Sequence, residues 1–286
     1  MSEERKIIAD DGLIARKQGR WAQQKLDFID RYLPPALSAT RRKDHRVFLD
    51  LFAGPGLNRT EDGFEFPGSP LRVLQSGTGQ GSPVALSRYV GINLDDDDHE
   101  ALHERVRRLE SAGLCRVPDV SLINDDANVC VGRVLAGIPT DAWVCAFVDI
   151  EKPKQLPWAT LETLRRRHWS VDLYLLFPLE MGWNRMIPEW QQSEHIFDLA
   201  FGCGDWRPIV GERLNSSHQF RARRQLLSLY ESRLRTLWKY VRMVKAVNLR
   251  GDQKLYRMFH ASNHRAGKNI AEWASTPAGT NLELFD

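Results

Sequence analysis

The chain has 286 residues, 42% of them hydrophobic and 27% charged, with a formal net charge of +3. This composition is typical of a globular protein with a sizeable core and excludes a disordered chain. No apolar run approaches the roughly 18 residues of a membrane span, and the charged N-terminus "MSEERKIIADDG" lacks the apolar core of a signal peptide. We therefore expect a cytoplasmic protein.

The four cysteines, Cys115, Cys130, Cys145 and Cys203, stand far apart and form no metal-ligand spacing with each other or with histidine, so we expect no metal site. Cys130 and Cys145 lie in apolar stretches, which predicts buried thiols.

The chain begins with a predicted helix over 21–32, "WAQQKLDFIDRY", which "LPP" should end. A basic linker and a strand, "RVFLDLF", follow, and the pair Ser69 and Pro70 predicts the start of another helix. Strands and helices then alternate, which indicates a parallel sheet with crossover helices. The further strands are expected at 87–94, 119–125, 142–149 and 171–178, and the helices between them at 99–112, 129–136 and 157–167.

The pattern changes after Pro178. Residues 182–217 are rich in aromatic side chains and look like an irregular insertion. A long amphipathic helix over 218–240 precedes two strands, 242–249 and 255–262, that should form an antiparallel hairpin. The tail from Trp273 should be poorly packed.

These elements match the α/β, Rossmann-like sheet of class I S-adenosylmethionine methyltransferases, which has seven strands with the last one antiparallel. We predict a single domain over 1–286, with an N-terminal helical extension (1–45) and an insertion (about 182–217).

The segment "VFLDLFAGPG" (47–56) joins a buried strand to a glycine turn. Glycines after a strand allow a sharp turn and the close approach of a ligand. The spacing D-x-x-A-G-x-G differs from the G-x-G-x-x-G of dinucleotide sites. In a methyltransferase this loop takes the methionine part of the cofactor, and we assign that role to Asp50, Phe52, Ala53, Gly54 and Gly56.

Polar residues also end the next strands. Asn93 and Asp95 should meet the ribose hydroxyls, Asp126 and Ala127 the adenine, and Asp149 the cofactor side of the fourth strand end. The alternative is that the acids only cap the helices that follow.

Three residues are candidates for proton transfer: Asp149 and Lys152 in "VDIEKPK", and His264 after the last strand. Glu151 and Lys152 could instead belong to a solvated loop, and His264 could bind a strand-end carbonyl. Trp158, Phe177, Pro178 and Trp183 could line a substrate pocket or pack in the core.

Residues 211–270 hold fourteen Lys or Arg but three Asp or Glu. On the long helix, Arg221, Arg224 and Arg235 lie opposite the apolar face. A stripe that carries positive charges alone favours an anionic partner, such as a nucleic acid, over an ordinary solvated helix face.

The chain resembles the three-Cys-motif partner protein family (TcmP), whose core is methyltransferase-like. The resemblance is carried in family order by "RWAQQKLDFIDRYLP", "VFLDLFAGPG", "PGSPLRVL", "NDDAN", "PWATLETL", "DLYLLFPL" and "LYRMFHASNHRAGK". It implies a neighbour-encoded partner that bears three cysteines and resembles radical S-adenosylmethionine enzymes. Two motifs depart from the family: "INLD" replaces "IELD" or "IEKD", so Asn93 stands for a ribose-binding acid, and "DIEK" replaces "DPFG".

The main hypothesis is therefore an S-adenosylmethionine-dependent methyltransferase that acts on a nucleic acid or another anionic substrate. The alternative is a catalytically altered partner protein that kept the fold and lost the transfer. A nicotinamide enzyme is a third hypothesis.

Overall fold

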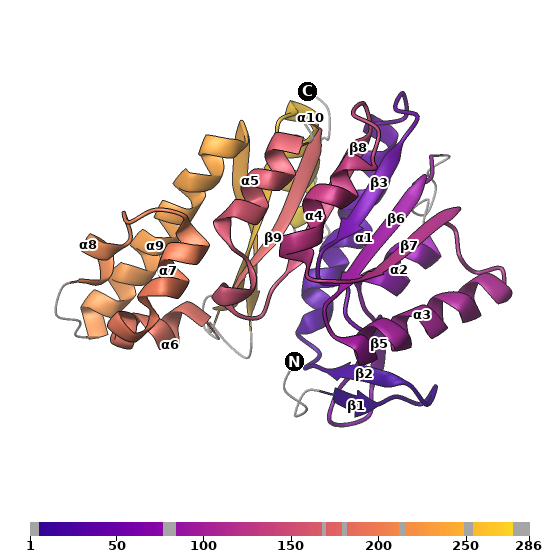
Figure 1. The fold of residues 1–286 in the computed structure, drawn as a ribbon, viewed down its shortest axis with the longest axis horizontal. Coiled ribbons are helices and arrows are strands. Elements are labelled where there is room, and N and C mark those ends of the chain that lie inside the picture. The colour runs from indigo at the N-terminus through magenta and orange to yellow at the C-terminus, as the bar shows by residue number, and fades with distance from the viewer. Residues whose placement is uncertain are drawn as a thin grey trace.

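The computed structural model describes residues 6–76, 84–167, 170–178, 182–211, 216–248 and 254–276. Its centre is a seven-stranded sheet with the order β10-β11-β9-β8-β3-β6-β7 (Figure 1). In chain order the strands are β3 (Arg46–Asp50), β6 (Arg88–Asn93), β7 (Asp119–Asn124), β8 (Trp143–Asp149), β9 (Val171–Pro178), β10 (Tyr240–Asn248) and β11 (Lys254–Ser262).

Five of these strands pair in parallel, from β9 through β8, β3 and β6 to β7. β11 runs antiparallel both to β9 and to β10. This order, with a reversed last strand beside the fifth parallel strand, is the Rossmann-like sheet of class I methyltransferases, so the predicted fold class is confirmed.

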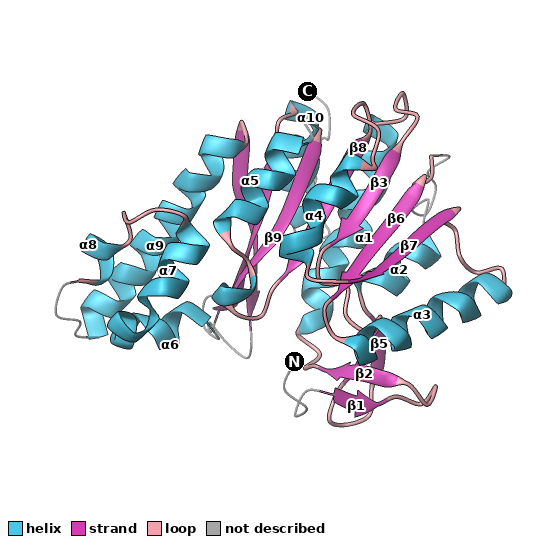
Figure 2. Cartoon of the chain, in the orientation of Figure 1, coloured by secondary structure: helices cyan, strands magenta, loops and turns pink. Residues whose placement is uncertain are grey.

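Helices cover both faces of the sheet (Figure 2). α4 (Ala127–Ala136), α5 (Trp158–Arg167), α7 (Glu194–Phe201) and α9 (Ser216–Leu237) contribute to the core on one face. α1 (Ala22–Ala39), α2 (Ser69–Ser76), α3 (Asp96–Ser111) and α10 (Arg265–Ser275) contribute to the core on the other. None of these described helices is long and apolar enough to cross a bilayer.

Two cysteines lie in these cores as predicted. Cys130 and Cys145 are 2% and 1% exposed, and burial raises the pKa of the Cys145 thiol well above its usual range.

The first helix is longer than predicted. α1 continues through Pro34 and Pro35 to Ala39. Proline weakens a helix because it lacks an N–H group. Here the last turns bury Leu33, Ala36 and Leu37, and this packing outweighs the lost hydrogen bonds.

The N-terminal part is not only helical. β1 (Lys6–Ile8) and β2 (Ile14–Lys17) form a hairpin, and β2 pairs with β4 (Leu57–Arg59), which pairs with β5 (Glu65–Pro67). β4 and β5 of this small second sheet belong to the segment between β3 and α2, for which the sequence analysis predicted no strand.

The predicted irregular insertion is also folded into helices. α6 (Asn184–Met186), a 3-10 helix (Ile187–Ser193), α7 and α8 (Arg207–Val210) occupy its described part. At the C-terminus, α10 extends the ordered chain to Ser275, two residues beyond the predicted start of the loose tail, and residues 277–286 lie outside the described residues.

Candidate functional site

A tight turn follows β3 at the edge where the parallel strands end. Gly54 and Gly56 have φ of 65° and 83°, in the left-handed region that favours glycine. The Asn93 side chain, at the end of β6, fixes this turn from the neighbouring strand. Its Oδ1 accepts a hydrogen bond from the Gly54 amide (2.6 Å), and its Nδ2 donates one to the Gly54 carbonyl (3.0 Å).

A buried arginine on α3 joins the turn to the N-terminal hairpin. Arg105 is 4% exposed, and its Nη1 donates to the carbonyls of Pro55 (2.6 Å) and Ile14 (2.7 Å). Its Nε also donates to Asp11 Oδ2 (2.7 Å). One guanidinium therefore holds both the glycine turn and the β1–β2 hairpin.

A cavity of about 610 Å³ opens beside this turn, at the carboxyl ends of β3, β6, β7 and β8. Such a volume lies within the range of small-molecule sites. Its wall includes these predicted residues: Phe52, Asn93, Asp95, Asp126, Ala127, Asp149 and Lys152. A small hollow of about 20 Å³ nearby shares Phe52 and Asp149 with it and adds Ala53 and Gly56.

Asp50 lies beneath this surface and is fully buried. Burial raises the pKa of its carboxyl to about 7, although a hydrogen bond with the Ser69 hydroxyl opposes the shift, and the nearby Asp149 carboxylate adds to it. The Tyr89 hydroxyl lies 3.4 Å from Asp50 Oδ2. Asp50 thus supports the turn from inside and does not line the cavity.

Two predicted ligand acids also cap helices. Asp95 Oδ1 accepts from the Asp98 amide (3.1 Å) at the start of α3 and pairs with Lys6 Nζ (2.7 Å). Asp126 Oδ1 accepts from the Asn128 amide (2.8 Å) at the start of α4. Both acids therefore cap helices, as the alternative expects, but both also line the cavity, so capping does not remove them from the candidate site.

Two cations at the site were missed by the sequence analysis. Arg16 on β2 lines the cavity, with Nη2 3.6 Å from Asp98 Oδ2. Burial lowers the pKa of Arg16, but the carboxylates around it, first Glu151 and then Asp98 and Asp149, more than offset this effect and raise the pKa.

The second missed cation is Lys25 on α1, which is 5% exposed and forms an ion pair with Asp149 Oδ2. A signal for it was present. Lys25, Phe28, Ile29 and Tyr32 recur at helical spacing and are all buried, so a charged residue on this apolar stripe required a buried partner.

The Gln155 side chain holds the start of the loop after β8. Gln155 Oε1 accepts from the amides of Glu151 (2.9 Å) and Lys152 (2.7 Å). Glu151 is buried and Lys152 is exposed at the cavity rim, so only Glu151 departs from the solvated-loop interpretation.

His264, the third candidate for proton transfer, does not lie at this cavity. Because β11 runs antiparallel, its end lies at the opposite edge of the sheet. His264 Nε2 is 3.4 Å from the hydroxyl of Ser170, the residue before β9. His264 is therefore not part of this cavity.

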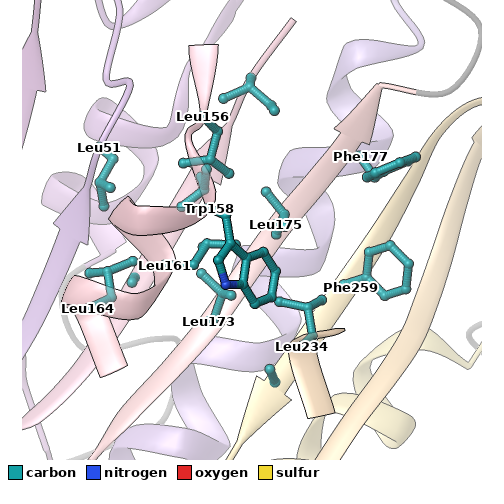
Figure 3. Close-up of a cluster of buried hydrophobic side chains, with 14 of the residues drawn as sticks. Leu51, Leu156, Trp158, Leu161, Leu164, Leu173, Leu175, Phe177, Leu234 and Phe259 are labelled. Carbon is teal, nitrogen blue, oxygen red and sulfur yellow. The ribbon is translucent and has the colours of Figure 1, made fainter. Parts of the chain in front are cut away.

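The four residues expected to form a substrate wall are core residues. Trp158, Phe177 and Trp183 are 3%, 2% and 1% exposed, and Pro178 is buried as well. Figure 3 shows Trp158 and Phe177 among leucines of α5, β9 and α9. Phe177 and Trp183 stack with ring centroids 5.4 Å apart, so the core alternative is correct.

The basic stripe forms a separate surface. Arg221, Arg224 and Arg235 are exposed on α9, and Arg235 pairs with Glu231. Figure 1 shows α9 with α7 and α8 at the end of the molecule opposite α3 and the β1–β2 hairpin. The stripe therefore does not line the cavity.

No family model and no curated protein matches the chain by sequence. Among solved structures, Trm1 from Pyrococcus horikoshii with S-adenosyl-L-methionine aligns over 91% of this chain with 11% identity and a TM-score of 0.48. The alignment spans 59% of Trm1. Pyrococcus horikoshii TYW2 in complex with MeSAdo aligns over 92% of this chain and 74% of its own, with 9% identity and a TM-score of 0.40.

The methyltransferase domain of a bacterial Hen1 aligns over 82% of this chain and 99% of its own, with 11% identity and a TM-score of 0.42. All three TM-scores lie below 0.5, so the fold class of this chain rests on its own strand order and pairing.

The buried Asp50 carboxyl should make stability depend on pH. Its folded pKa of about 7 lies above the ordinary value of 3.8, so the folded state binds more protons between these values and stability falls as pH rises through that window. From pH 5 to pH 8 the loss should be about 2–3 kcal/mol. Asp50→Asn should remove this part of the pH dependence in urea unfolding measured at both pH values.

The exposed Asp119→Asn is the matched control and should keep the wild-type slope. Equal slopes for Asp50→Asn and the wild type would contradict the assignment.

Proposed function

We propose that the chain is an S-adenosylmethionine-dependent methyltransferase whose cofactor binds in the cavity at the carboxyl edge of the sheet. The observation that carries this proposal is the charge arrangement at the glycine turn. The guanidinium of Arg16, whose side chain is 13% exposed, lies there among the carboxylates of Asp98, Asp149 and Glu151.

This arrangement suits the methionine end of the cofactor. That end carries a carboxylate, an ammonium and a sulfonium, so it needs one cation and several anions close together. Arg16 is the group for the carboxylate, and the surrounding acids suit the two positive groups. The pyrophosphate of a nicotinamide dinucleotide would instead meet mainly negative charge, which disfavours the third hypothesis.

The other end of the cavity suits an adenosine. Oδ1 of Asp126 caps α4. Oδ2 accepts no hydrogen bond from the described residues, so it can accept one from the amino group of an adenine. Leu94 lines the cavity and is 72% exposed, so it offers an apolar surface to a base. Asn93 is engaged with Gly54, and we therefore assign the ribose hydroxyls to Asp95.

Bound S-adenosylmethionine would supply an electrophilic methyl group. The chain would then align an acceptor and help to remove its proton. Asp149 and Lys152 are the predicted residues for this role that line the cavity. The basic stripe on α9 supports a nucleic acid or another anionic substrate, which would contact Arg221, Arg224 and Arg235 outside the cavity.

One contact favours the alternative of a catalytically altered partner protein. Lys25 forms an ion pair with Asp149 Oδ2, so this oxygen of the carboxylate proposed to take the proton is already engaged. The alternative keeps the resemblance to the three-Cys-motif partner proteins and a radical S-adenosylmethionine-like partner bearing three cysteines. We propose that the chain belongs to this family, that its partners are a nucleic acid and the three-cysteine protein, and that it is located in the cytoplasm.

A labelled-methyl assay separates the two functions. The methyltransferase proposal predicts label transfer from S-adenosylmethionine to a component of cellular nucleic acid or extract, and Asp149→Asn should reduce it by about 10²-fold or more. Cofactor binding by calorimetry without transfer to any fraction would favour the partner protein.

Calorimetric titration with S-adenosylhomocysteine tests the site itself. The wild type should bind it, NAD should give no heat, and Asp126→Ala should weaken binding about tenfold because a charged acceptor is lost. Asp119→Ala changes an exposed acid at the start of β7, the strand that precedes Asp126, and should bind like the wild type. NAD binding, or equal affinity in the two variants, would count against the site.

The role of Arg16 can be tested by comparing S-adenosylhomocysteine with adenosine, which lacks the methionine end of the cofactor. Arg16→Ala should weaken S-adenosylhomocysteine binding at least about tenfold and leave adenosine binding unchanged. The neighbouring Lys17 pairs with an exposed glutamate, Glu61, so Lys17→Ala is the matched control. An equal loss of both ligands in Arg16→Ala would mean that the residue supports the fold of the site and does not bind the carboxylate.

A further inference from the structure

The first turns of α9 carry an aromatic side chain on the solvent face of the helix. The buried face of α9 is formed by residues at four-residue steps: Ala222, Leu226, Tyr230 and Leu234. Phe220 lies away from this stripe and is 61% exposed. Within the described part of α9 no other large hydrophobic side chain is exposed to this extent.

The other exposed phenylalanine of the described chain is covered by its own neighbours. Phe64 is 39% exposed, the Arg20 guanidinium lies 4.6 Å from the centroid of its ring, and the Phe66 ring stacks on it at 6.1 Å. Phe220 makes no such contact with a described ring or guanidinium. Its ring is therefore open to a planar group from another molecule.

The charges beside Phe220 are positive. The stretch of α9 from residue 218 to 230 contains three arginines and no acid. Two of them, Arg221 and Arg224, are exposed, and neither side chain forms an ion pair with a described residue. Farther along the helix, Arg235 is already engaged with Glu231. Exposed guanidinium groups without an acid beside them suit phosphates.

This end of α9 lies at the same edge of the sheet as the proposed cofactor cavity. Tyr240, at the start of β10, pairs with Ser262 at the end of β11, and β11 is antiparallel to β9. β10 therefore starts at the amino edge, and α9, which leads into it, starts on the side of the carboxyl edge. Figure 1 agrees: α9 rises from the level of α6, which follows β9, towards that of α10, which follows β11.

We propose that the first turns of α9 form a docking site for single-stranded nucleic acid, in which Phe220 stacks on an unpaired base and Arg221 and Arg224 contact phosphates. This inference rests on the proposed function for the nucleic acid and adds which state of the strand the surface selects. A duplex presents only the edges of its bases in its grooves, whereas an unpaired base offers its face to an aromatic ring. The strand then continues along the edge at which the cofactor cavity opens.

The remaining exposed side chains of α9 fit this partner better than a membrane or a protein. A helix that lies on a membrane needs an apolar face, and the core of a protein interface contains several apolar side chains. Beyond Phe220, the exposed face of α9 continues with Gln225, Ser228 and Ser232. Amide and hydroxyl groups of this kind bind phosphate oxygens and sugars.

Fluorescence anisotropy with labelled oligouridylate of about 12 nucleotides and an RNA duplex of the same length tests the role of Phe220. The full chain should bind the single strand more tightly than the duplex. Phe220→Ala should weaken single-strand binding about tenfold and leave duplex binding unchanged, and Phe220→Trp should keep the wild-type preference. Phe64→Ala, which changes the covered phenylalanine, is the matched control and should bind both probes normally.

The arginines have a different signature, because phosphate contacts depend on salt and not on base pairing. The double variant Arg221→Gln/Arg224→Gln should weaken both probes. For the single strand, the slope of log Kobs against log salt concentration should become shallower by about 1.4, since two phosphate contacts are lost. Arg107→Gln/Arg108→Gln removes two exposed arginines that pair with Glu104 on α3, and it should keep the wild-type slope.

Equal affinity of the wild type and Phe220→Ala for the single strand would overturn the docking site, as would tighter binding of the duplex, of anionic vesicles or of polyglutamate. Calorimetry with S-adenosylhomocysteine on the same preparation separates this outcome from the proposed function. A chain that binds S-adenosylhomocysteine but not the single strand would overturn the docking site alone. A chain that binds the single strand with the Phe220 dependence, but not S-adenosylhomocysteine, would support the docking site and contradict the cofactor site.

Discussion

The Asn93 carboxamide holds both the N–H and the C=O of Gly54, and this pair of hydrogen bonds ties the end of β6 to the turn after β3. A carboxylate could accept from the amide but could not donate to the carbonyl, whereas a carboxamide does both. The asparagine at this position, where the family that the sequence resembles has an acid, therefore has a structural role. Asn93 stabilises the glycine turn, and the wall of the cavity takes its shape from that turn.

The electrostatics of the site depend on contacts that are distant in sequence. Asp149 pairs with Lys25, Asp95 with Lys6, and Asp98 lies near Arg16. Each cation comes from the segment before β3 and each acid from a strand end or the helix that follows it. Burying a carboxylate without such a partner would be costly, so the N-terminal segment and the sheet form one electrostatic unit.

Local patterns predicted the sheet well. Apolar runs located all seven strands of the main sheet, and the acids before α3 and α4 were recognised as possible caps. The failures came from tertiary effects. α1 continues past two prolines because its last turns are packed in the core. Because β11 is antiparallel, His264 lies at the edge of the sheet opposite to the one predicted. Trp158 is buried in the core and does not line a pocket. Arg16 and Lys25 could not be assigned partners because those partners lie far along the chain.

The cations that lie beside the acids of the cavity, Lys6, Arg16 and Lys25, precede β3, in a segment that contributes no strand to the main sheet. Part of the ligand preference of the cavity is therefore encoded outside the strands that set the topology of the sheet. Exchange of the charged residues in the first forty positions, with the apolar face of α1 kept, would change which ions the cavity admits while the sheet stayed the same.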